Sequence, residues 1–217
     1  MIKTSQIAAI MSNIKRYSIT PSLIQESDAE HAFLTSFLII EASTKYKELF
    51  KKVDRESLLI RATLHDLSES IVGDVSSVAK RSVVNGFKIF SAMETSAAEQ
   101  LYEGRNEDFK ELLVKSINFE DDTSIEEVLF KCFDYMCVVI KTINELKMGN
   151  TFYLKVLDEI SEVLKNLKVI IKLQADFGLD TKFKYLLEFY DAEILGLLDE
   201  ARSIANSFGA NIDDNDK

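Results

Sequence analysis

The 217-residue sequence contains no tryptophan, only one proline and only seven glycines. Proline and glycine interrupt helices most strongly, so their scarcity favours long uninterrupted helices. The two cysteines, Cys132 and Cys137, match neither a CxxC motif nor a disulfide framework, and we interpret them as reduced thiols in the interior. The sequence also lacks an apolar run of roughly 18–20 residues and the layout of a signal peptide. We therefore expect no membrane span and a cytoplasmic location.

Basic residues are few relative to acidic ones. Lysine and arginine number 26 against 36 aspartates and glutamates, which gives a formal net charge of −10 and a pI near 4.8. A nucleic-acid polymer binds to clustered Lys and Arg, so this balance argues against such a partner. It does not exclude a small phosphorylated substrate, because a local cation overrides a global negative field.

The apolar residues, 47% of the chain, recur at spacings of three and four, which predicts an all-α fold with a substantial core. Ser27 with Glu30, and Ser124 with Glu127, have the spacing of helix-capping boxes. Repeats and linker composition are absent, so we predict one helical domain over 1–208 and a flexible acidic tail over 209–217. We expect helices over 4–15, 28–50, 54–73, two within 75–104, and one each over 124–148, 152–175 and 181–207.

The two histidines carry the main functional signal. His31 follows the first capping box, and His65 is followed at once by Asp66 on a different predicted helix. Imidazole nitrogens and carboxylate oxygens from separate helices are suited to a divalent cation, because no single helix can surround an ion. Each histidine alone is more typical of a hydrogen-bonded core residue, and a His-Asp dipeptide is common by chance.

The order of the surrounding residues is more specific. The sequence resembles the HD-domain metal-dependent phosphohydrolases, in particular the branch of YfbR-like 5′-deoxynucleotidases. That branch has an Arg-Trp pair, an S-E-H helix start, an H-D-x-x-E-x-x-x-G-D run with a following Lys, and a later K-x-x-D. The resemblance covers about residues 14–146 and implies a single HD-domain helical bundle with additional C-terminal helices. The matching residues are Arg16-Tyr17, Glu30-His31, His65-Asp66, Glu69, Gly73-Asp74, Lys80 and Lys131-x-x-Asp134.

The resemblance implies a role for each matching position. Glu69 matches a carboxylate next to the water that the metal binds, and Asp74 matches the acid that assists the leaving group. Arg16, Tyr17 and Lys80 match positions near the phosphate and sugar of the substrate. One divalent ion is implied, and its identity among Mn, Co, Mg, Zn and Fe stays open. Its four ligands would be His31, His65, Asp66 and Asp134.

Spacing adds one expectation of its own. His65 and Glu69 are four residues apart, so on one continuous helix they would share a face and address the same ion. Two departures from the family pattern concern the substrate. Tyr17 replaces the tryptophan, and Ser76-Ser77-Val78-Ala79-Lys80 replaces a Pro-x-Pro-x-Lys segment. Preferences for base and sugar therefore stay open.

Three functions remain in competition. The favoured one is hydrolysis of a deoxynucleoside 5′-monophosphate to deoxynucleoside and phosphate. The second keeps the fold and the metal but releases triphosphate from a dNTP. The third is a non-catalytic protein that binds nucleotide in a retained pocket, which the complete set of motif residues disfavours. The family resemblance and the apolar faces of the C-terminal helices also imply a homodimer or larger homo-oligomer.

Overall fold

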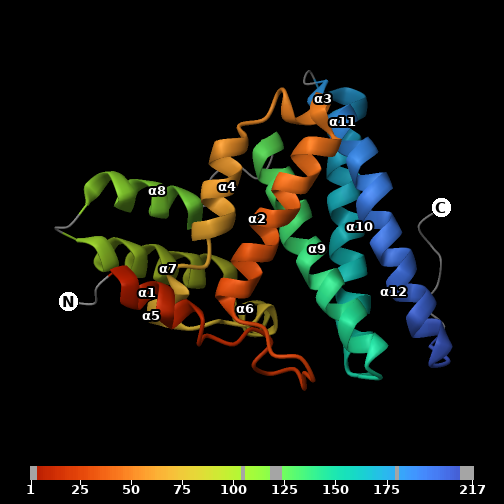
Figure 1. Cartoon of the computed structure of the whole chain (residues 1–217), viewed down its shortest axis with the longest axis horizontal. Coiled ribbons are helices and arrows are strands. Elements are labelled where there is room, and N and C mark those ends of the chain that lie inside the picture. The colour runs from red at the N-terminus through yellow and green to blue at the C-terminus, as the bar shows by residue number, and fades with distance from the viewer. Residues whose placement is uncertain (1–3, 104–105, 118–123, 179–180, 211–217) are drawn as a thin grey trace. The chain divides into compact units, whose positions relative to one another are not determined.

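The structure is a computed structural model that describes residues 4–103, 106–117, 124–178 and 181–210. Within these ranges every regular element is a helix, which confirms the all-α prediction (Figure 1). None of the described helices is long and apolar enough to cross a membrane. The chain divides into two compact units. Unit 1 comprises Met1–Pro21, Gln25–Phe37 and Glu56–Asp121, and unit 2 comprises Ser22–Ile24, Leu38–Arg55 and Asp122–Lys217. The single domain over 1–208 stays a prediction, and 211–217 of the predicted tail lie outside the described residues.

Unit 1 is built around helix α7 (Gly86–Tyr102), which packs against α5 (Glu69–Val72), α6 (Ser77–Ser82) and α8 (Glu107–Ile117). Helix α1 (Thr4–Met11) packs on α5, and α4 (Arg55–Leu64) lies in this unit from its second residue onward. Leu64 and Leu67 pack against the core of the unit and so fix the segment that follows α4. That core consists of Ile7, Ala98, Leu101, Tyr102, Leu113 and Ile117.

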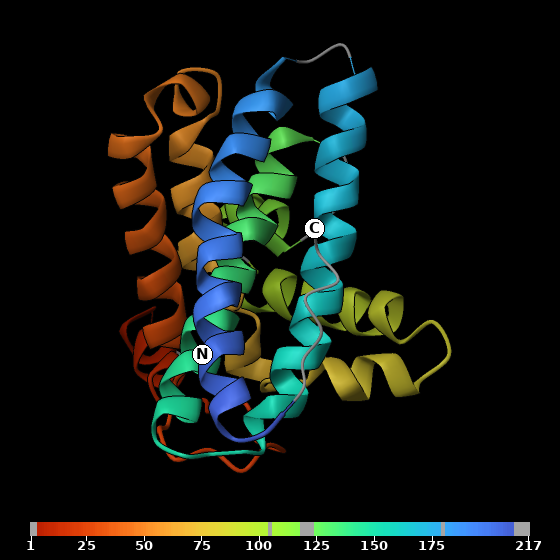
Figure 2. The same ribbon diagram turned by 90° about the vertical axis from the view of Figure 1, so that its right-hand side faces the viewer.

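Unit 2 contains three long helices that lie side by side in both views, α9 (Ile125–Lys147), α10 (Tyr153–Phe177) and α12 (Leu195–Ser207) (Figures 1 and 2). It also contains α3 (Lys47–Phe50), α11 (Lys182–Phe189) and a π-helical turn, η1 (Tyr190–Ile194). On α9, Leu129, Phe133, Met136 and Ile143 recur at helical spacing and are buried. Cys132 and Cys137 are buried and are not joined in a disulfide.

The helix predicted over 54–73 is interrupted, and this corrects one expectation about the site. Helix α4 ends at Leu64, residues 65–68 form a turn, and α5 begins at Glu69. The turn arises because Leu67, Glu69 and Ser70 each donate a backbone hydrogen bond to the carbonyl three residues earlier, as in a 3₁₀ turn. His65 and Glu69 therefore do not share a face of one continuous helix. Helix α8 was not predicted.

Candidate metal centre

The first turn of α2 (Asp28–Lys45) presents two side chains to the site. The predicted capping box is formed: Ser27 N donates to Glu30 Oε2 over 2.7 Å, and Glu30 N donates to Ser27 Oγ over 3.3 Å. Asp28 and His31 are three residues apart on this turn, so they point to the same side of α2. Both side chains are buried. The cap thus fixes the start of the helix and the direction of both groups.

His65 is held in the turn that follows α4 by its own ring nitrogen. Nδ1 of His65 lies 3.2 Å from the carbonyl oxygens of Arg61 and of Ala62. Because a carbonyl oxygen only accepts, Nδ1 carries a hydrogen in this arrangement, so Nε2 is the ring nitrogen that a metal ion could bind. A backbone contact of this kind is the usual way in which a metal-ligating histidine is oriented.

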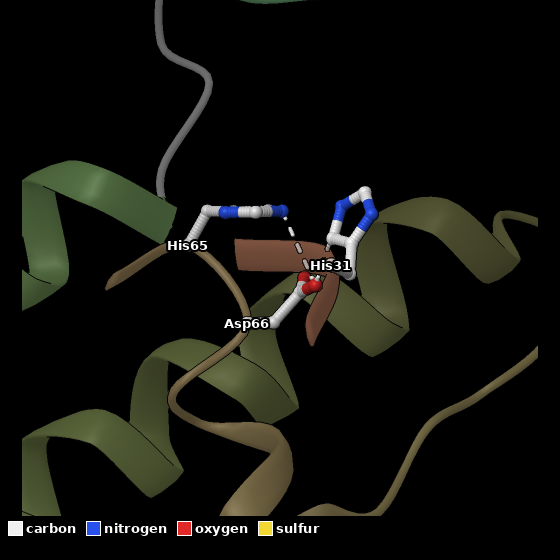
Figure 3. Close-up of side chains that lie close together, drawn as sticks. All are labelled: His31, His65 and Asp66. Carbon is white, nitrogen blue, oxygen red and sulfur yellow. Dashed lines mark ion pairs between the residues drawn. The ribbon is translucent and has the colours of Figure 1, made fainter. Parts of the chain in front are cut away.

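His31, His65 and Asp66 converge on one point (Figure 3). The Oδ2 atom of Asp66 lies 3.2 Å from His65 Nε2 and 3.8 Å from His31 Nε2, and the imidazole centroids are 5.3 Å apart. Bonds of about 2.1 Å in a tetrahedral site place ligand atoms about 3.4 Å apart, between these two distances. The three donor atoms therefore fit one divalent ion of the class that accepts mixed nitrogen and oxygen ligands.

A second group consists of the carboxyls of Asp28, Asp66 and Glu69, whose oxygen atoms also lie within 4.8 Å of one another. Both oxygens of Asp28 and Oε2 of Glu69 are buried. In the described part of the chain, none of these three atoms accepts a hydrogen bond from an N–H group or an alcohol or phenol hydroxyl. Sequence reasoning missed Asp28. Its signal was the three-residue spacing to His31, but an acidic residue in a first helical turn is ordinarily explained by the helix dipole.

Arg16 balances part of this negative charge. Its Nη1 atom lies 2.7 Å from Asp66 Oδ2 and 3.7 Å from Asp28 Oδ1, and its Nε atom lies 3.7 Å from Glu26 Oε1. The predicted phosphate-binding arginine is thus placed beside a predicted metal ligand. Glu26 is a further residue that the sequence did not single out, and it also lies 3.9 Å from His31 Nδ1.

Burial and charge separate the pKa values of the three carboxyls. Burial alone would raise the pKa of Asp66, but the positive charges of His65 and Arg16 outweigh it and hold that pKa below its usual range. Burial and then the negative charge of Asp66 raise the pKa of both Asp28 and Glu69. Without a cation, the protein therefore does not keep all three carboxyls ionised near neutral pH.

Asp74 follows Gly73, whose φ of 75° lies in the left-handed region that glycine adopts without strain. The backbone N–H of Tyr17 donates to Asp74, and Tyr17 itself has φ of 58°, a conformation that costs energy in a bulky residue. Burial raises the pKa of Asp74 despite the opposing charge of Arg16. A carboxyl of this kind suits the donation of a proton to a leaving group.

The remaining predicted residues lie on α6 and α9. Lys80 on α6 forms a 2.8 Å ion pair with Glu94 on α7, a partner that the sequence did not single out. The pKa of Lys80 is raised because this pairing outweighs the effect of burial. Asp134 is half-buried on α9 in unit 2, and its role as the fourth ligand stays a prediction.

Comparisons with known proteins add a family and a fold. The model of the family described as 5′-deoxynucleotidase YfbR-like matches residues 5–175. A 5′-deoxynucleotidase of Vibrio atlanticus is 27% identical over 165 residues, which cover 74% of this chain and 83% of that protein. Among solved structures, an HD-domain phosphohydrolase of Listeria innocua aligns with a TM-score of 0.69 and 16% identity over 94% of this chain and 97% of its own. An HD phosphohydrolase of cyanophage S-2L, bound to dA and one catalytic Zn²⁺ ion, aligns with a TM-score of 0.55 and 17% identity over 95% and 99%. Both structural likenesses confirm the predicted helical fold.

Proposed function

The chain belongs to the family of YfbR-like 5′-deoxynucleotidases, and from this premise we propose that it hydrolyses deoxynucleoside 5′-monophosphates to deoxynucleoside and phosphate. The observation that carries the proposal is the convergence of His31, His65 and Asp66 on one point, with a buried carboxyl and a guanidinium beside it. That set combines a site for a divalent ion, a proton-transfer group and a phosphate ligand. A metal-dependent phosphohydrolase needs these three parts.

We assign the metal ligands to His31, His65, Asp66 and Asp134. The first three are supported by their distances, and Asp134 rests on the Lys131-x-x-Asp134 motif alone. When bound, the ion would supply a Lewis acid for the phosphoryl oxygens and lower the pKa of a water molecule. His65 is already oriented for this by the carbonyl contacts of Nδ1, which leave Nε2 to bind.

The protein's own residues would move two protons. The carboxyl of Glu69 lies in the same cluster of carboxyls as that of Asp66, so Glu69 is placed to accept the proton of the attacking water. Asp74 keeps its proton to a higher pH than an exposed aspartate, so it is suited to protonate the 5′ oxygen as the P–O bond breaks. The two carboxyls thus take opposite parts in the proposed reaction, and the backbone N–H of Tyr17 contacts Asp74.

Arg16, Tyr17 and Lys80 are proposed as substrate-binding residues. The planar fork of Arg16 suits two phosphate oxygens, and its contact with Asp66 keeps it at the position where the phosphate must lie. The ion pair of Lys80 with Glu94 holds its ammonium group in a fixed direction. Tyr17 stands where the family has tryptophan, and its ring is the natural candidate for contact with the base or sugar.

Product identification tests the proposal. The chain is incubated with Mn²⁺ and each common nucleotide, and phosphate, triphosphate and nucleoside are separated. Deoxynucleoside monophosphates should yield nucleoside and phosphate. Release of triphosphate from a dNTP would favour the second candidate function instead. Turnover that survives complete removal of metal, or no turnover with any nucleotide, would contradict the proposal.

We further propose a homodimer or larger homo-oligomer that works in the cytoplasm. Apolar residues on the last turns of α10 support the first part, because Val169, Ile170, Leu173 and Phe177 are exposed in the single chain. Cys132 and Cys137 are buried and not joined in a disulfide, which suits a reducing compartment. Light scattering at micromolar concentration should give a mass of at least twice 24.6 kDa, and a monomer would contradict the assembly.

A further inference from the structure

We propose that Asp28, Asp66 and Glu69 form a second divalent-cation site beside the one made by His31, His65 and Asp66, with Asp66 shared between the two. The proposal rests on the proposed function in one respect, since the first ion is part of it. It adds a ligand, Asp28, for which the family motif has no role, and it predicts a second ion of different chemistry.

Asp28 lies against another carboxyl, that of Glu69, and its ion pair with Arg16 spans 3.7 Å. It begins α2, yet the cap of that helix is completed by Ser27 and Glu30. Neither of its oxygens accepts a hydrogen bond from a backbone N–H or from a hydroxyl group in the described part of the chain. Its residue exposure is 0%, so solvent does not stabilise the carboxylate either. A buried carboxylate in this state costs several kcal/mol unless a cation or a proton compensates it.

Glu69 shows the same feature from another element. It begins α5, is 7% exposed, and its Oε2 atom is buried without an N–H or hydroxyl donor among the described residues. Asp28 and Glu69 therefore approach Asp66 from α2 and from α5, and these two carboxyls contact each other. Oxygens of all three lie within 4.8 Å of one another. Carboxylates from separate elements at this spacing are suited to a hard divalent cation.

Arg16, which lies beside the three carboxyls, does not take the place of a metal ion. Arg16 Nη1 lies 2.7 Å from Asp66 Oδ2 but 3.7 Å from Asp28 Oδ1, beyond hydrogen-bond distance. Asp28 therefore accepts no hydrogen bond from the guanidinium, and its other printed contact is with a second carboxyl, that of Glu69. In the proposed function, Arg16 also binds the phosphate of the substrate. Its positive charge is then shared with the phosphate and neutralises the carboxyls less.

Charge balance supports a second ion. Asp28, Asp66 and Glu69 interact electrostatically, and the guanidinium of Arg16 lies beside them. Lys80 is paired with Glu94 and contributes little net charge. One divalent ion and Arg16 carry three positive charges, which only balance the three carboxylates. A phosphate dianion would add two negative charges, and a second divalent ion offsets them.

The two sites should differ in metal preference. The first has two imidazole nitrogens and one carboxylate among its described ligands, which suits Zn²⁺. The second has only carboxylate oxygens, which suit Mg²⁺ and Mn²⁺. Zn²⁺ binds nitrogen-containing sites more tightly than Mn²⁺, so zinc placed in the first site is not displaced by manganese.

The experiment loads the full chain with one equivalent of Zn²⁺ and then titrates Mn²⁺, counting bound manganese from the loss of the electron paramagnetic resonance signal of free Mn²⁺. The wild type should bind one Mn²⁺ per chain, and Asp28→Asn should bind none while keeping its zinc. Glu26→Gln is the matched control, because it removes another carboxylate partner of Arg16 outside the group of three and should still bind one Mn²⁺.

Zinc uptake without manganese binding by the wild type would overturn the inference, and so would equal manganese binding by Asp28→Asn. The wild-type titration decides the matter even if Asp28→Asn fails to fold. The outcomes separate this inference from the proposed function. A chain that binds zinc and hydrolyses deoxynucleotides but does not bind manganese would contradict only the second site. A chain that binds no zinc would contradict both proposals.

Discussion

At the scale of single residues, the contacts of the candidate metal centre meet at Oδ2 of Asp66. It lies 2.7 Å from Arg16 Nη1 and 3.2 Å from His65 Nε2, so a guanidinium contacts the oxygen that a metal ion would bind. A metal ion that binds this oxygen repels the guanidinium and weakens its contact with Asp66. Arg16 is then available to phosphate oxygens. Metal binding is therefore coupled, through the carboxylate of Asp66, to the availability of Arg16 as the proposed phosphate ligand.

This coupling predicts that Arg16→Ala has opposite effects on the affinity for metal and on the affinity for substrate. The affinity for Zn²⁺ should rise, because a competing positive charge beside Asp66 is removed. The KM for a deoxynucleoside monophosphate should rise by about 10- to 100-fold, the loss expected for a charge-assisted hydrogen bond of about 1.5–3 kcal/mol. Isothermal titration with Zn²⁺ and steady-state kinetics measure the two effects. Arg81→Ala, at an exposed position of α6, is the control, and weaker zinc binding in Arg16→Ala would contradict the competition.

Glu69 allows a second prediction at this scale. Glu69→Ala should retain the zinc bound by His31, His65 and Asp66, because Glu69 is not among those three donors. Its kcat should fall by about 10²- to 10⁴-fold, the usual loss for a general acid–base group. Metal analysis and kinetics on the same preparation separate the two roles. A Glu69→Ala protein that contains no zinc would show that the residue belongs to the first metal site.

The sequence identified the residues that belong to a motif, and it missed residues that only the packing of the chain brings to the site. His31, His65 and Asp66 followed from residue type and order, and the structure brings them together. Asp28 did not follow, because an acid in the first turn of a helix is common for electrostatic reasons alone. Glu94 did not follow either, since one of 36 acidic residues carries no signal until α7 places it against Lys80.

At the scale of elements, helix starts were more predictable than helix ends. Ser27 and Ser124 cap α2 and α9 as expected, because a cap is a local side-chain to backbone contact. The end of α4 at Leu64 was missed, because no glycine or proline marks it. It is produced by the packing of Leu64 and Leu67 into the core of unit 1, which sequence periodicity does not reveal.

The junction of α6 and α7 gives a prediction about packing. A Cβ atom at Gly86 would lie 2.0 Å from the carbonyl oxygen of Lys80, a backbone atom that cannot move away cheaply. Gly86→Ala should therefore destabilise unit 1 by about 1–3 kcal/mol, as overpacking does. Gly196→Ala is the matched control, because a Cβ there meets nothing within 4 Å on helix α12. It should stabilise by about 0.5–1 kcal/mol. Urea unfolding measures both, and changes of the same sign would contradict the geometry.

The attachment of the Ser22–Ile24 segment to α9 gives a pH prediction. Glu145 is buried and accepts hydrogen bonds from Leu23 N, Ile24 N, Lys141 and Asn150. Burial alone would raise the pKa of Glu145, but these bonds outweigh it and lower that pKa from 4.5 to about 2.

A lowered pKa stabilises the folded state above pH 4.5, and the effect is lost as the pH falls towards 2. The shift corresponds to about 3 kcal/mol. In urea unfolding, the advantage of wild type over Glu145→Gln should therefore shrink as the pH falls from 5 to 3. Glu162→Gln, at an exposed position of α10, controls for the loss of one carboxyl. An advantage that grows with acidity would contradict the sign.

At the scale of the whole molecule, the proposed metal ligands connect parts of the chain that are distant in sequence. His31 lies on α2, which runs from unit 1 into unit 2, whereas His65 and Asp66 lie in the turn after α4. An unfolded chain cannot hold these donors together, so an ion that binds them favours the folded state. The stability of the molecule should therefore depend on free metal concentration.

Thermal unfolding with and without metal tests this dependence. At a free Zn²⁺ concentration about 100-fold above Kd, the free energy of unfolding should rise by about 2.7 kcal/mol. For a chain of this length that corresponds to a Tm increase of about 5–10 °C. His65→Ala should show no increase, while Lys88→Ala, at an exposed position of α7, should behave as the wild type. If unit 1 unfolds separately, only its transition should move, because the three described donors belong to that unit. A zinc-induced shift of equal size in His65→Ala would show that the ion binds elsewhere.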